Sequence, residues 1–105
     1  MNLTTLQNEV AEWAARNFKG KQPHQPLLGV AEEVGELCHA HLKNEQGIRG
    51  TPVEHYDAKV DAVGDICIYL ADYCIQNAIN LDEAVTKAWE EVKRRDWIKN
   101  HKDGK

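Results

Sequence analysis

Apolar residues recur at intervals of three and four along four separate stretches of this chain, and no stretch alternates apolar with polar residues as a half-buried strand would. This pattern predicts an all-α fold. From the apolar positions and the interruptions between them, we expect helices over about residues 4–18, 26–44, 53–77 and 81–99. In a chain of 105 residues, four such helices favour one domain, residues 1–105, folded as a small four-helix bundle.

Residues suited to helix starts stand at the expected boundaries. Thr4 or Thr5 is available to cap the first helix, and Pro26 suits the first turn of the second. Thr51, which is followed by a proline, marks the start of the third helix, and Asn80 precedes the fourth. We expect the chain from His101 onward to be frayed.

Charge and cysteine content exclude several classes of protein. A formal net charge of −4 argues against a nucleic-acid binder that works by neutralising phosphates, although seven of the thirteen Lys and Arg residues fall between Lys87 and Lys105. The odd number of cysteines does not suggest a disulfide framework, and their apolar surroundings predict reduced core residues at Cys38, Cys67 and Cys74.

The first five residues lack the basic and hydrophobic regions of a signal peptide, and no apolar run approaches the roughly 20 residues that span a bilayer. We therefore expect a cytoplasmic protein with no membrane partner. The segment 66–71 is apolar nearly all round the helix, which predicts burial on several sides, within the bundle and against another subunit.

Two groups of carboxylates interrupt the two most hydrophobic helical stretches. The second predicted helix carries Glu32, Glu33 and Glu36 within one turn, and the third carries a stripe of acids at intervals of four that includes Asp61 and Asp65. Acids this close repel one another, and burial would add a desolvation cost unless a cation or protons compensate. Mg²⁺ prefers oxygen ligands and is commonly held by a few carboxylates together with substrate phosphates. The pattern predicts a magnesium site, with Mn²⁺ as an alternative ion.

A solvated acidic helix face is the simpler interpretation of any one of these groups, because exposed carboxylates are common. Two groups on helices expected to face each other favour the metal site instead.

The segments 27–37 (LLGVAEEVGEL) and 61–70 (DAVGDICIYL) resemble the MazG-like nucleotide pyrophosphohydrolases of the all-α NTP pyrophosphatase superfamily, over most of the chain from Trp13 to Trp97. The resemblance implies a MazG-like helical bundle assembled as a homodimer or homotetramer. It also implies Mg²⁺-dependent cleavage of a nucleoside triphosphate between its α and β phosphates, which yields a nucleoside monophosphate and pyrophosphate.

Matched residue by residue, the family motif implies Glu33, Glu36 and Asp65 as metal ligands and Glu32 as a ligand or a base that positions water. The family has a glutamate three residues before the last acid, where this chain has Ala62. Asp61, one position earlier, still lies one turn from Asp65 and can take that role.

Basic and aromatic residues complete the predicted site. The family has a Lys/Arg pattern on its last helix that contacts the triphosphate, which implies phosphate-binding and catalytic roles for Lys87 and Arg94. Trp13 and Phe18 are candidates for stacking on a base, although Trp13 also fits the apolar stripe of its helix. Arg49, in a loop flanked by glycines, is a further candidate for contact with the substrate.

Two other functions are compatible with parts of the sequence. Glu36 and His39 form an E-x-x-H string like those of carboxylate-bridged di-iron bundles, but the second such string that those proteins need is missing. The chain could also be a non-catalytic helical interaction module whose acids face solvent and whose third helix mediates dimerisation.

Overall fold

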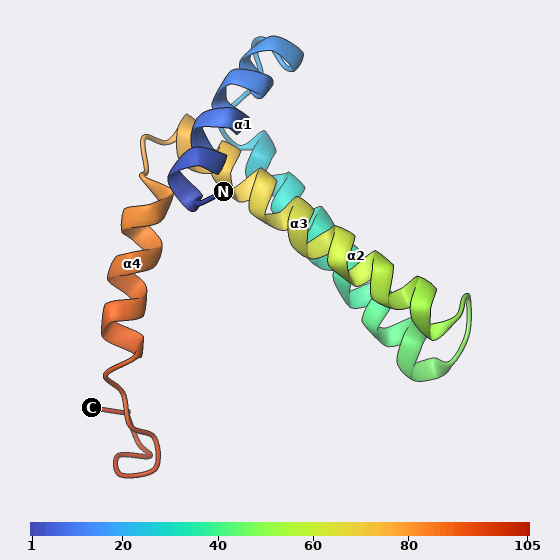
Figure 1. Ribbon diagram of the computed structural model, residues 1–105, viewed down its shortest axis with the longest axis vertical. Coiled ribbons are helices and arrows are strands. Elements are labelled where there is room, and N and C mark those ends of the chain that lie inside the picture. The colour runs from blue at the N-terminus through green and yellow to red at the C-terminus, as the bar shows by residue number, and fades with distance from the viewer.

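The computed structural model of residues 1–105 contains four α-helices and no strand (Figure 1). The prediction of an all-α fold with four helices is therefore confirmed. The helices are α1 (Leu3–Asn17), α2 (Gln25–Gln46), α3 (Pro52–Gln76) and α4 (Leu81–Val92).

Helices α2 and α3 form a long antiparallel hairpin (Figure 1). Gly47 ends α2 in the left-handed conformation, with φ of 68°, and its N–H donates to the carbonyl oxygens of Asn44 and Lys43. Thr51 starts α3 with a capping box, because its hydroxyl accepts from the Glu54 N–H while the Glu54 carboxylate accepts from the Thr51 N–H. These two caps fix the length of the loop between the helices.

Small residues set the distance between the two helices of the hairpin. A side chain at Gly29 of α2 would overlap the ring of Tyr69 on α3, so the glycine is required for that approach. Further along the hairpin, Ala40 and Ala62 are both buried. The two backbones therefore lie close enough for side chains of α2 and α3 to share one site.

The core lies where α1 crosses the C-terminal half of α3. Val10, Ala71, Cys74 and Leu81 are buried together there. Gln7 of α1 ties the α3–α4 turn to this core, because its amide nitrogen donates to the Ile79 carbonyl at 2.7 Å and its amide oxygen accepts from the Leu81 N–H at 2.9 Å. This packing places α1 beside the end of the hairpin that leads into α4.

Helix α4 packs on α1 and then runs away from the hairpin (Figure 1). The four helices of one chain therefore do not close into a bundle. The radius of gyration is 17.1 Å, whereas a compact chain of this length has about 13 Å. A single copy of the chain thus leaves much of its helical surface uncovered.

Apolar side chains lie exposed both on the α2–α3 hairpin and on α4. Trp89 of α4 is 58% exposed and Val60 of α3 is 54% exposed. Even the apolar run of α3, for which burial on several sides was predicted, leaves Ile68 and Leu70 partly open. No helix combines the length and the apolarity that crossing a bilayer requires.

The C-terminal region differs from its prediction. Helix α4 ends at Val92 rather than near residue 99, because the N–H groups of Arg94 and Arg95 donate to carbonyls only three residues back, those of Glu91 and Val92. Further on, the Asp96 carboxylate accepts from the N–H groups of Ile98 and Lys99 at 3.0 Å. The expectation of a frayed tail is also wrong. Gly104 is buried, and its carbonyl accepts from the Asp96 N–H at 2.7 Å.

Two smaller predictions also need correction. The first helix is capped by Asn2, whose side chain accepts from the Thr5 N–H, and neither Thr4 nor Thr5 is its cap. All three cysteines are free, but only Cys74 belongs to the core, since Cys38 and Cys67 are exposed.

Candidate metal centre between two helices

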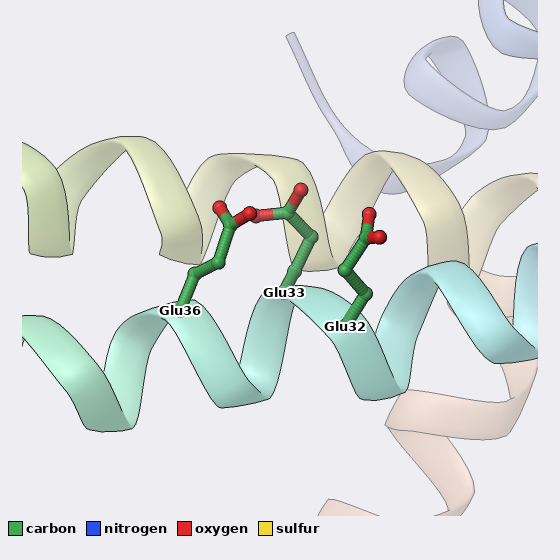
Figure 2. A group of neighbouring side chains, drawn as sticks. All are labelled: Glu32, Glu33 and Glu36. Atoms are coloured by element: carbon green, nitrogen blue, oxygen red, sulfur yellow. The ribbon is translucent and has the colours of Figure 1, made fainter.

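Three glutamates of α2 converge on the side of that helix that faces α3 (Figure 2). Carboxylate oxygens of Glu32, Glu33 and Glu36 all lie within 4.8 Å of one another. The spacing of three and four residues along the helix places them on one flank, as the sequence predicts. The cluster therefore provides several oxygen ligands within the span of a single cation.

Glu33 is the member of this cluster that cannot be a solvated surface acid. It is only 7% exposed, and its Oε2 atom is buried without a hydrogen-bond partner. Burial raises the pKa of Glu33 above its ordinary value of 4.5, and a hydrogen bond with Glu36 and the negative charges of Glu36, Asp65 and Glu32 raise it further. The site thus favours a proton or a cation between Glu33 and Glu36.

Asp65 of α3 lies opposite this cluster. Its charge contributes to the raised pKa of Glu33, and it lines one cavity together with Glu33 and a second together with Glu36. Asp61 lines the second cavity as well, beside Glu36 and Asp65. Asp65 and Asp61, both exposed, therefore share cavities with the glutamates, but only the three acids of α2 have carboxylate oxygens within 4.8 Å of one another.

The second cavity, of about 410 Å³, extends from the cluster toward the α2–α3 loop and is also lined by Arg49. Arg49 has a positive φ of 63°, which is unusual for a residue with a side chain. The neighbouring Ile48 carbonyl lies 2.9 Å from Nε2 of the buried His55. His55, which the sequence analysis did not single out, thus holds the loop that carries Arg49 beside the acids.

Trp13 and Phe18 line a different cavity from the one that contains Arg49. Their rings meet edge to face, with centroids 5.5 Å apart, and both line a cavity of about 260 Å³ that also contains Glu33 and Asp65. Both rings remain about half exposed. The two aromatic residues predicted to contact a base therefore line the same cavity as two of the predicted metal ligands.

Tyr69, one turn beyond Asp65 on α3, also borders this cavity. Burial raises the pKa of its hydroxyl above the ordinary value of 10.0, and the negative charges of Glu32, Glu33, Asp65 and Glu36 raise it further. The hydroxyl stays protonated and remains a hydrogen-bond donor near the acids.

A buried ion pair at the same end of the hairpin was missed by the sequence analysis. Lys21, from the segment between α1 and α2, donates to Asp72 Oδ2 at 2.6 Å, and both side chains are 12% exposed. Asp72 stands seven residues after Asp65, so the interval of acids along α3 could have revealed it. Nothing in the local sequence around Lys21 indicates this pairing.

Lys87 and Arg94 are not brought to the carboxylates within one chain. Lys87 is exposed on α4, which leads away from the hairpin (Figure 1). Arg94 lies beyond the end of α4, so the two residues do not share a helical face, and its guanidinium is 3.9 Å from the Glu90 carboxylate.

Comparison of the chain with models of known protein families, with curated proteins and with solved structures finds no match. The chemistry of the site must therefore be judged from its own residues. An acidic cluster with a buried, unpartnered oxygen fits a hard cation, because Mg²⁺ takes oxygen ligands and would offset the repulsion among the acids.

Proposed function

We propose that this protein is a Mg²⁺-dependent nucleoside triphosphate pyrophosphohydrolase, which cleaves its substrate between the α and β phosphates and releases a nucleoside monophosphate and pyrophosphate. The observation that carries the proposal is the buried, unpartnered Oε2 of Glu33, set among the carboxylates of Glu32 and Glu36. An acid in that position is costly without a compensating positive charge.

Glu33, Glu36 and Asp65 would hold the metal ion, with Asp61 assisting. When bound, Mg²⁺ or Mn²⁺ would offset the charge of the phosphate oxygens and lower the pKa of a bound water. These four residues supply only carboxylate oxygens, which these hard ions prefer to the softer nitrogen and sulfur ligands.

The chain's own residues would position the other reactants. Glu32 is exposed at the edge of the cluster, where its carboxylate can orient the attacking water and accept its proton. Arg49, across the 410 Å³ cavity from the acids, would hydrogen-bond to phosphate oxygens. The oxygen of the water forms a bond to phosphorus, and the bond to the departing phosphate oxygen breaks.

Trp13 and Phe18 would contact the base of the nucleotide. They border the cavity on the other side of the cluster, and aromatic faces stack on bases of any sequence. The substrate would thus extend from the aromatic pair, past the metal ligands, toward Arg49.

Lys87 and Arg94 would act on the site of a second copy of the chain. One copy has exposed apolar side chains on both α3 and α4, and its radius of gyration exceeds that of a compact chain. The basic run Lys93-Arg94-Arg95 that follows α4 complements the acidic hairpin in charge. A homodimer, or a homotetramer built from it, would cover the apolar surfaces and place the partner's Lys87 and Arg94 near the carboxylates.

An assay of canonical and modified nucleoside triphosphates with Mg²⁺ tests this function. The proposal expects pyrophosphate as the phosphorus-containing leaving product, and no orthophosphate. Activity should disappear with chelator and return with Mg²⁺ or Mn²⁺. Failure of every triphosphate to yield pyrophosphate, in the presence of either ion, would reject the enzyme assignment.

The exposed apolar surface also favours a second candidate, a helical interaction module without catalysis. This candidate predicts that Mg²⁺ and a nucleotide together do not raise the melting temperature, whereas the enzyme must be stabilised by what it binds. A di-iron centre has less support. His39 does line the cavity that contains Glu36, but the second E-x-x-H string of such bundles is missing.

A further inference from the structure

Asp72 lines the cavity that also contains Trp13 and Phe18, and one of its carboxylate oxygens has no hydrogen-bond partner. The residue is 8% exposed, and its Oδ1 atom is buried without a partner. Its other oxygen, Oδ2, accepts from Lys21 at 2.6 Å. Buried polar atoms in folded proteins almost always have a partner, so an orphaned carboxylate oxygen beside a cavity indicates a missing donor.

The surroundings of Asp72 fit a planar ring that carries N–H groups. The cavity of about 260 Å³ has aromatic walls from Trp13, Phe18 and Tyr69, and Ile68 adds an apolar contact. Glu33 borders the same cavity, so a ring placed here would have its substituents directed toward the metal ligands. Aromatic walls with one convergent acceptor are typical of a site that recognises a heterocyclic base.

Lys21 holds the Asp72 carboxylate in place. The ammonium group lies 5.9 Å from the centroid of the Phe18 ring, so it contacts both the acid and one wall of the cavity. Because Lys21 uses only Oδ2, it orients the carboxylate without filling the acceptor position of Oδ1.

We propose that Asp72, oriented by Lys21, is a specificity-determining residue that accepts a hydrogen bond from a ring N–H or exocyclic amino group of the substrate's base. This inference rests on the proposed function and extends it. The substrates would be nucleotides whose bases keep an unalkylated hydrogen-bonding edge, and bases methylated on that edge would be rejected because the Asp72 oxygen would stay unpaired.

Binding of nucleosides without phosphates tests this inference apart from hydrolysis. Substituting Trp89→Phe and Trp97→Phe leaves Trp13 as the single tryptophan of the three, so its fluorescence reports the cavity. Uridine, cytidine, adenosine and guanosine are titrated without metal. Each is compared with a counterpart methylated so that its edge has lost its N–H donors.

We expect at least one unmodified nucleoside to quench Trp13, and its methylated counterpart to bind about ten-fold more weakly. Asp72→Ala should weaken binding of the unmodified nucleoside by a similar factor and leave binding of the methylated one unchanged. Asp57→Ala, which removes an exposed carboxylate from the same helix, is the matched control and should change neither.

Equal binding of the two nucleosides of every pair to the otherwise unaltered chain would overturn the inference, as would no binding at all. The comparison of ligands needs no Asp72 variant, so it stands even if Asp72→Ala fails to fold. Pyrophosphate release is measured separately. Asp72-dependent binding without hydrolysis would reject the proposed enzyme and keep the base site, whereas hydrolysis with no dependence on Asp72 would do the reverse.

Discussion

The hairpin of α2 and α3 and the arm formed by α4 differ in how much of their packing is provided by the same chain. The hairpin has capped helices, close backbone packing at Gly29 and a set of acids that meet between its two helices. Helix α4 is amphipathic and is followed by the basic residues Lys93, Arg94 and Arg95, yet beyond the buried Leu81 it leaves apolar side chains such as Trp89 largely exposed. Under the proposed function, the hairpin of one chain would suffice to bind the metal ion, whereas Lys87 and Arg94 would contact phosphate only in a second copy.

The largest effect is expected from the hairpin. Glu36→Gln removes a negative charge from the cluster and should lower pyrophosphate release by about a thousand-fold, because electrostatic contributions of this kind are the main part of such catalysis. Helical content should not change. Glu45→Gln, on the same helix but outside the cluster, is the control and should keep full activity.

The next largest effect is expected from a substitution on α4 that blocks assembly but leaves the hairpin intact. Trp89→Glu places a charge on the exposed apolar side of α4 and should shift the protein toward monomer in sedimentation experiments, with loss of most activity. Binding of Mg²⁺ alone should persist. A dimer that survives this substitution would contradict the role of α4 in assembly.

Mixing two inactive variants tests whether Arg94 of one copy acts in the site of the other. Glu36→Gln lacks a metal ligand and Arg94→Ala lacks a phosphate contact, so each alone should be inactive or nearly so. A mixed dimer contains one site in which both defects are absent if Arg94 acts across the interface. Recovery of activity on mixing is expected, and its absence would place Arg94 outside the partner's site.

A smaller effect is expected where the two helices of the hairpin approach most closely. Gly29→Ala would overlap the Tyr69 ring and should destabilise the protein by about 1–3 kcal/mol, as overpacking typically does. Gly35→Ala is the matched control on the same helix, because a methyl group there meets open space and should be neutral or stabilising. Chemical denaturation measures both.

The smallest effect is a change in pH dependence without metal. The pKa of Glu33 is raised in the folded protein, so its contribution to stability is present below its ordinary value of 4.5 and is lost as the pH rises through the raised value. Glu33→Gln should therefore raise the stability of the metal-free protein, relative to the unaltered chain, more at neutral pH than at acidic pH. Melting curves of both proteins with chelator would show this difference, and parallel pH profiles would contradict it.

Most of the fold could be predicted from local sequence signals. The cap residues Thr51 and Asn80 stand where α3 and α4 begin, and Gly47 stands where α2 ends. The structure after α4 was missed because it depends on Asp96, whose side chain accepts from backbone N–H groups and whose own N–H donates to the Gly104 carbonyl.

The candidate site was predictable only where its residues share one helix or a helical interval. Glu32, Glu33 and Glu36 meet because of their spacing, and Asp65 lines a cavity with Glu33 because the hairpin places α3 against α2. The Lys21–Asp72 pair depends on how the α1–α2 connection folds over α3, which no local pattern encodes. The direction of α4 likewise depends on packing against α1, and an amphipathic sequence alone does not determine it.

Calorimetric titration with Mg²⁺ tests most directly whether the acids of α2 and α3 surround one cation. We expect saturable binding to the unaltered chain, abolished in Glu36→Gln and in Asp65→Asn and retained in Glu45→Gln. Equal Mg²⁺ binding by all four proteins, or none by any of them, would show that these carboxylates do not form a metal site.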